Sequence, residues 1–111
     1  MTKPELFDVV ELWVNLPEAG LQVGAQGPIV EQYAPDSYEV EFVNESGETI
    51  ALVVLKISQF VIAWQAQSKL WVPISERLQA LVVALPEDAL LEVFDFARFV
   101  HSRRKIGRAH V

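Results

Sequence analysis

The amino-acid sequence predicts an α+β fold, in which a small β-barrel of about five strands is followed by a C-terminal helical hairpin. Residues 7–62 contain short apolar segments separated by glycine, proline and asparagine, which is typical of short strands and turns. Residues 74–105 instead repeat apolar side chains at the period of an amphipathic helix. We therefore expect a barrel over residues 1–63, a linker over 64–73 and the hairpin over 74–105.

The most regular strand is expected at residues 38–42. Its apolar side chains, Tyr38, Val40 and Phe42, alternate with two glutamates, so one face would be buried and the other solvated. The segment that follows contains Gly47, which can adopt a positive φ angle. We therefore expect a hairpin turn after this strand.

The return strand, at residues 49–55, is β-branched and apolar on both faces, which favours a central position in the sheet. Further short strands are expected at residues 7–14, 29–33 and 59–62, with a long loop at 15–26. Because closure removes exposed edges, such short strands favour a small barrel over a flat sheet.

The hairpin is expected to begin with Ser75 as the N-cap of a first helix that runs to about residue 84. Pro86 then interrupts the chain and can serve as the first residue of a second helix. Acidic residues lie in the first turn of that helix and basic residues in its last turn, as the helix dipole favours.

The second helix is more apolar than a simple surface helix. One apolar stripe is joined by further large apolar residues around its side, so the helix is expected to be covered by something. The barrel itself, a second copy of the chain or a partner protein could provide this cover. The candidate partner-binding residues are Leu91, Phe94, Phe96, Phe99 and Val100.

Charge is distributed unevenly along this chain of net charge −6. Residues 1–72 carry three lysines against ten carboxylates, whereas residues 73–111 carry six basic against five acidic side chains. The acidic first part argues against nucleic acid as a ligand and suits a basic protein partner, although it could also be simply a well-solvated surface. The sequence contains no long apolar run and no secretory signal, so a cytoplasmic protein without a membrane segment is expected.

No catalytic motif is recognisable, and the absence of cysteine excludes thiolate nucleophiles, disulfides and cysteine-ligated zinc. Glu39 and Glu41 could form a carboxylate pair, but the solvated face of a strand explains them as well. Gly24 and Gly27 are best explained by turn geometry. His101 lies near the end of the second helix, where a dipole role is commoner than catalysis. We therefore expect no enzymatic activity, no cofactor and no metal site.

Several motifs resemble a small bacterial family, domain of unknown function 4926 (DUF4926), over about residues 5–62. The sequence reads Leu-Pro-Glu-Ala-Gly-Leu at residues 16–21, Gly-Ala-Gln-Gly at 24–27 and Tyr-Glu-Val-Glu-Phe at 38–42, in the order and spacing of that family. This resemblance implies an SH3-like β-barrel and membership of toxin–antitoxin or stress modules.

Residues 74–105 resemble a second family, domain of unknown function 2281 (DUF2281), whose Leu-Pro corner precedes a helix with the pattern seen at residues 92–100. That resemblance implies an antitoxin-like helical segment. The tail at residues 106–111, Ile-Gly-Arg-Ala-His-Val, resembles a translated sequencing adapter and is left out of the fold prediction as artefactual.

Three functions remain open at this point. The leading hypothesis is a protein-interaction module, antitoxin-like, that binds a basic toxin-like protein or forms a homodimer through its C-terminal helix. The alternative is a nucleic-acid- or ribosome-associated small barrel, with Trp13, Trp64 and Trp71 as a stacking surface. The acidic charge around these residues argues against stacking and favours packing in the core or linker. An accessory subunit of a metalloenzyme follows only from analogy of fold.

Overall fold

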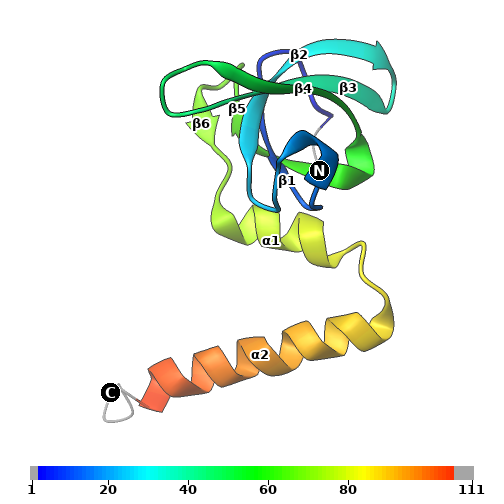
Figure 1. Ribbon diagram of the computed structural model, residues 1–111. Coiled ribbons are helices and arrows are strands. Elements are labelled where there is room, and N and C mark those ends of the chain that lie inside the picture. Colours follow the sequence, from blue (N-terminus) through cyan, green and yellow to red (C-terminus); the bar gives the residue numbers. More distant parts are fainter. Residues whose placement is uncertain (1–2, 107–111) are drawn as a thin grey trace. The chain divides into compact units, whose positions relative to one another are not determined.

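The computed structural model describes residues 3–106 and divides into two compact units, Met1–Leu78 and Gln79–Val111 (Figure 1). The first unit contains all the strands, and the second consists of helix and turn. The expected α+β class is therefore confirmed. The expected tail is outside the described residues, except for Ile106 at the end of the last helix.

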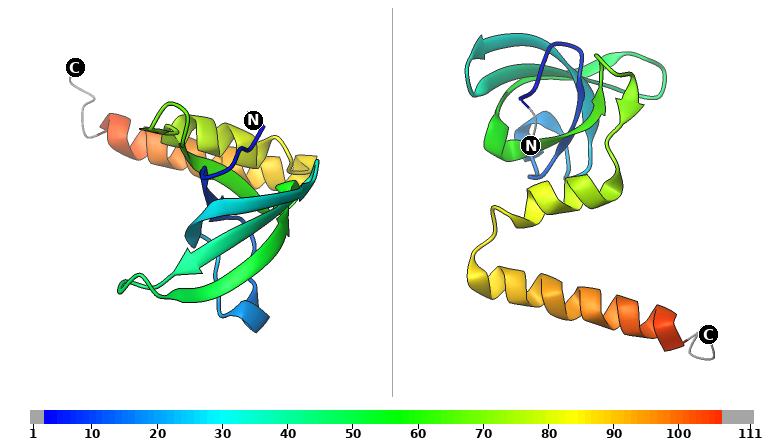
Figure 2. Two further views of the ribbon diagram at one scale, coloured as in Figure 1. Left: turned by 90° about the horizontal axis from the view of Figure 1, so that it is seen from above. Right: turned by 180° about the vertical axis from the view of Figure 1, so that it is seen from behind.

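The first unit is built around one antiparallel sheet of six strands in the order β4-β3-β2-β1-β5-β6. Both views in Figure 2 show that this sheet is strongly twisted and curved. Two short 3₁₀ helices, η1 (Pro17–Ala19) and η2 (Ile57–Gln59), connect strands. The strands are β1 (Val9–Leu12), β2 (Gln26–Ala34), β3 (Ser37–Val43), β4 (Thr49–Lys56), β5 (Phe60–Gln65) and β6 (Leu70–Trp71).

Two sequence predictions about the sheet need correction. The sheet has six strands instead of about five, because β6 forms inside the segment expected to be a linker. The backbone N–H of Lys69 donates to the carbonyl of Gln65 (2.8 Å), and the tight turn brings Trp71 opposite Trp64. A strand of two residues is too short to produce a sequence period. The pairings also leave β4 and β6 as edges of an open sheet, so closure into a barrel is not seen.

The core of the first unit is an apolar cluster, and its residues on β3 were correctly predicted. Tyr38, Val40 and Phe42 are all buried on the inner face of β3. The ring of Tyr38 meets Phe60 of β5 edge to face, with 5.8 Å between ring centroids. The rest of the cluster comes from β1, β2, β4 and the loop before β2, namely Val10, Leu12, Leu21, Ile29 and Leu55.

The turn between β3 and β4 also forms as predicted. The side-chain oxygen of Asn44 accepts hydrogen bonds from the backbone N–H groups of Ser46 (2.9 Å) and Glu48 (3.0 Å). Gly47 has a φ angle of 83°, in the left-handed region that favours glycine. Local side-chain and backbone preferences therefore suffice to place this hairpin.

The prediction of a central position for β4 is wrong. β4 lies at the edge of the sheet, and only its inner face packs on the core. On the outer face Ile50, Leu52 and Val54 are 52%, 55% and 52% exposed. The outer face of β4 is therefore apolar and exposed to solvent. A sequence pattern cannot distinguish such an exposed apolar face from one that another layer covers.

The two glycines assigned to turn geometry have different roles. Gly24 has a φ angle of 95°, so the turn explanation is confirmed for it. Gly27 lies within β2 and has no positive φ angle. A Cβ atom added there would lie 2.3 Å from the carbonyl oxygen of Glu41 on β3. Glycine is required at residue 27 because the backbones of β2 and β3 approach closely, which corrects the turn assignment.

A buried carboxylate ties the N-terminal segment to the end of β5. Asp8 is only 3% exposed and is the one buried charged residue among those described. One of its carboxylate oxygens accepts the backbone N–H of Glu5 (3.0 Å), and the other accepts that of Ala66 (2.8 Å). These charge-assisted bonds join segments 58 residues apart. No local sequence signal marks this role, because one of the two donors lies 58 residues away along the chain.

Two helices follow the sheet, as predicted: α1 (Ile74–Val82) and α2 (Glu87–Ile106). Ser75 lies inside α1 and not at its N-cap, because the helix begins at Ile74. The first helical hydrogen bond runs from the backbone N–H of Arg77 to the carbonyl of Pro73. The carbonyl of Pro86 accepts the N–H of Leu90 (2.9 Å), so Pro86 immediately precedes α2.

The start of α1 is attached to the sheet by one arginine. The guanidinium of Arg77 forms an ion pair with the Glu11 carboxylate on β1 (3.2 Å) and donates to the carbonyl of Val72 (3.1 Å). The Glu11 carboxylate also accepts from the side chain of Gln26 on β2 (3.2 Å). Both members of the ion pair are less than a third exposed, so solvent screens this pair less than a surface pair.

Candidate functional site

The candidate partner-binding residues all lie on α2, and we call them together the α2 surface: Leu91, Phe94, Phe96, Phe99 and Val100. Four of these side chains are more than half exposed, with Phe96 at 67%, Leu91 at 59%, Phe99 at 57% and Phe94 at 56%. Val100 is half-buried. Between Glu87 and Arg104 no residue of α2 is buried, so the apolar side chains of this helix are exposed or half-buried.

Contacts within the α2 surface are local to the helix. The rings of Phe96 and Phe99 lie 6.3 Å apart between centroids. The guanidinium of Arg98 lies over the ring of Phe94 at 5.3 Å, and that of Arg103 lies over Phe99 at 5.4 Å. Each of these cation–π pairs spans one helical turn and contributes about 0.5–1 kcal/mol at an exposed position.

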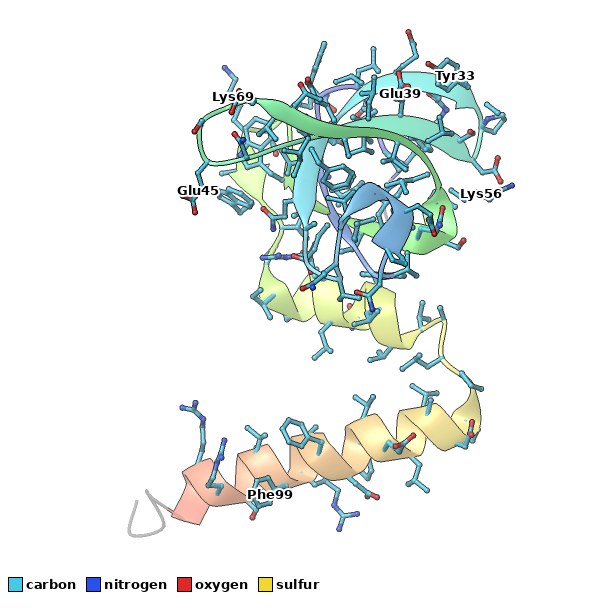
Figure 3. The ribbon with its side chains drawn as sticks, in the orientation of Figure 1. Tyr33, Glu39, Glu45, Lys56, Lys69 and Phe99 are labelled. Carbon is cyan, nitrogen blue, oxygen red and sulfur yellow. The ribbon has the colours of Figure 1, made fainter. Side chains whose placement is uncertain are left out.

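The aromatic side chains of α2 do not share one narrow stripe. Each residue advances about 100° around a helix, so Phe94 and Phe99 are separated by roughly 140°. Figure 3 shows Phe99 projecting from α2. Arginine and aromatic side chains together are typical of the energetically important centres of protein interfaces. A partner would therefore have to surround much of the helix to bury all of this surface.

The two glutamates considered as a carboxylate pair lie on the outer face of β3 with separate partners. Glu39 accepts a hydrogen bond from the hydroxyl of Tyr33 on β2 (2.9 Å; Figure 3), and Glu41 accepts one from the hydroxyl of Thr49 on β4 (2.5 Å). The bond to Glu39 is the main cause that raises the pKa of Tyr33, and burial and the negative charges of Glu39 and Glu31 add to it. This arrangement matches the solvated face of a strand, which was the second explanation for these residues.

The three tryptophans considered as a stacking surface are only partly brought together. Trp64 and Trp71 are direct cross-strand partners on β5 and β6. Trp13 lies beyond the opposite end of β1, where its backbone N–H donates to the carbonyl of Gln59 (2.8 Å). Trp71 is 60% exposed, whereas the other two are half-buried. The structure therefore contains an aromatic pair but no three-residue platform.

His101 is exposed on α2. Within residues 3–106, no group of three or more histidine, aspartate and glutamate side chains is arranged to hold a metal ion. Neither helix of the described chain is both long and apolar enough to span a membrane.

Comparison with known families and proteins adds one finding. A family model described as a domain of unknown function (DUF4926) matches residues 6–62. The match covers the strands from β1 to the start of β5 and leaves the α2 surface outside it. Searches of curated proteins and of solved structures returned no match. The resemblance of residues 74–105 to DUF2281 stays a prediction.

Proposed function

The chain belongs to the DUF4926 family, and from this premise we propose that it is a non-enzymatic protein-interaction module of antitoxin-like kind, which binds a protein partner through the α2 surface. The partner is a basic, toxin-like protein. The sheet unit serves as an acidic scaffold, and α2 carries the apolar contacts. We also propose that the curved sheet is a partly closed version of the SH3-like barrel that the family resemblance implies.

The observation that carries the proposal is the exposure of large apolar side chains along α2. Burying one phenylalanine contributes about 1.5–3 kcal/mol, so Phe94, Phe96 and Phe99 together offer roughly 5–9 kcal/mol in gross terms. Association costs about 4–15 kcal/mol in lost freedom of motion. Burial of the three rings therefore about offsets the cost of association. A stable complex must also bury the neighbouring apolar side chains of the helix, as a groove around it would do.

Charge supports a basic partner. Residues 1–72 carry a net charge of −7, from three lysines and ten carboxylates. A field of this sign accelerates encounter with a basic protein and slows encounter with a phosphate backbone. Residues 73–111 carry six basic and five acidic side chains, so their net charge of +1 offsets little of this acidic field.

The proposal predicts that a neighbouring gene encodes a basic protein, and the test is co-purification with that protein. Phe94, Phe96 and Phe99 are replaced together by alanine, and Val83→Ala serves as the matched control because Val83 is 82% exposed outside α2. We expect the triple variant to lose the complex and the control to retain it, both with unchanged thermal unfolding of the sheet unit. Light scattering of the chain alone measures self-association. A complex that survives the triple variant would refute the proposal.

A further inference from the structure

The outer edge of β4 has unpaired backbone groups. β3 pairs with one side of β4, and the sheet order places no described strand on its other side. Among residues 3–106, no backbone–backbone hydrogen bond outside the sheet ladder involves residues 49–55. In an edge strand, alternate residues point their N–H and C=O groups away from the sheet. β4 therefore offers a free set of hydrogen-bonding groups on the side away from β3.

The features that normally prevent strand pairing are missing from β4. The strand is eight residues long and contains no proline, and its one charged residue, Lys56, stands at its end. The register is irregular only near Val43, and from Ala51 to Lys56 the pairing with β3 is continuous. Natural edge strands are usually kept short or interrupted by proline, a central charge or a bulge. The edge of β4 is thus able to pair.

The outer face of β4 has a composition that indicates what would pair with it. Ile50, Leu52 and Val54 form an exposed apolar row. On β3, Glu41 lies opposite Leu52 and Glu39 lies opposite Val54, so an acidic row runs beside the apolar one. Figure 3 shows Glu39 on the sheet and Lys56 at the far end of β4. This surface therefore combines apolar contact area with negative charge.

We propose that β4 binds an extended, basic segment of a partner protein as an added strand. The backbone of the segment pairs with the free edge of β4, and its Val, Ile or Leu side chains cover the apolar row. Adjacent strands are about 4.8 Å apart, so the acidic row lies roughly 10 Å from the added strand. Lysine and arginine side chains of the segment lie across β4, with their methylenes on the apolar row and their charged ends at Glu39 and Glu41.

A second copy of the chain fits this surface less well. Pairing β4 with its own copy would bring together two apolar rows, but the only cation that β4 carries is Lys56. Glu39 and Glu41 of both copies would then keep no opposite charge from the partner. The proposal concerns the sheet unit and is independent of the α2 surface, so either one can fail without the other.

The experiment uses the full chain and an eight-residue peptide, Val-Val-Lys-Lys repeated twice, so that each face of the added strand carries both valine and lysine. The corresponding Val-Val-Glu-Glu peptide is its control. Binding is measured by titration calorimetry, and amide hydrogen exchange locates the site. We expect the basic peptide to bind and to slow exchange at alternate residues of 49–55. Leu52→Lys places a charge in the centre of the edge and should weaken binding at least about tenfold.

Two further variants keep the result interpretable. Glu39→Gln with Glu41→Gln leaves the edge intact and should weaken binding and reduce its dependence on salt, because the charge pairs are lost. Val83→Lys is the control outside the sheet and should bind as the unmodified chain does. The proposal is overturned if no binding occurs, if the acidic peptide binds equally well or if Leu52→Lys has no effect. Protection of the outward-facing N–H groups of β4 without peptide would also overturn the proposal. Protection independent of concentration would indicate cover by the chain itself, and protection that increases with concentration would indicate a second copy.

Discussion

Replacing Gly27 with alanine tests the close approach of β2 to β3 that shapes the sheet. The added Cβ atom would lie 2.3 Å from the carbonyl oxygen of Glu41 and 3.1 Å from both the carbonyl carbon of Glu41 and Cγ1 of Val40. Ordinary contacts of a Cβ atom begin at 3.4 Å. The two backbones would therefore have to separate by about 1 Å in the middle of the core.

The expected cost follows from this displacement. Overpacking a well-ordered interior costs about 1–3 kcal/mol, and here the obstacle is backbone instead of a flexible side chain. We expect a loss near the upper end, roughly 3 kcal/mol. In a domain of this size, such a loss lowers the melting temperature by roughly 10–20 °C. Gly27 has no positive φ angle, so conformational strain of the alanine itself does not contribute.

Urea and thermal unfolding, followed by circular dichroism, measure the effect. Gly20→Ala is the matched control, because Gly20 has a φ angle of 70° but nothing within 4 Å of an added Cβ. It should lose only about 1 kcal/mol, from the left-handed backbone. If Gly27→Ala loses no more than this control, the close approach of β2 and β3 is not a constraint on the fold.

Three further predictions follow from single contacts. Asp8→Ala leaves two backbone N–H groups without their acceptor and should lower the free energy of unfolding in urea by about 2–4 kcal/mol. Asp8→Asn keeps one acceptor oxygen and should lower it less. Equal losses for the two variants would contradict the geometry with two hydrogen bonds. Burial, followed by the charge of Asp36, raises the pKa of Tyr38 above its usual value of 10.0, so the folded state keeps a proton that the unfolded state loses. The contribution of Tyr38 to stability should be full below about pH 10 and should be lost as the pH rises through the pKa of the folded state. In unfolding experiments from about pH 8 to 11, Tyr38→Phe should flatten this decrease in stability. An unchanged slope would exclude Tyr38 as the source of the decrease. Arg77→Ala removes the ion pair with Glu11 and should cost about 1–2 kcal/mol, with Arg77→Lys recovering part of it; a loss that salt leaves unchanged would indicate that packing of the side chain dominates.

Features that depend on neighbouring residues could be predicted from the sequence. The alternation around Tyr38 places the buried face of β3 correctly, because a strand has a period of two residues. The hairpin turn depends on Asn44 and Gly47, which lie within the turn itself. Pro86 marks the start of α2 because its own backbone cannot continue the preceding helix.

The candidate surfaces could be predicted only in part. The large apolar side chains of α2 can be identified in the sequence, but their exposure depends on what packs against the helix. The same limit explains the error at β4. Its second apolar face suggested cover on both sides, but Leu52 and its neighbours on the outer face are more than half exposed in the described part of the chain.

The sequence by itself determined where the longer strands, the β3–β4 turn and the two helices form, since backbone preference and side-chain period act between residues close along the chain. Only the tertiary structure decided that β4 is an edge, that Gly27 meets the backbone of Glu41 and that Asp8 binds the N–H of Ala66. Each of these features joins segments far apart in the chain. Their energies depend on which segments become neighbours when the sheet assembles, and no local pattern contains that information.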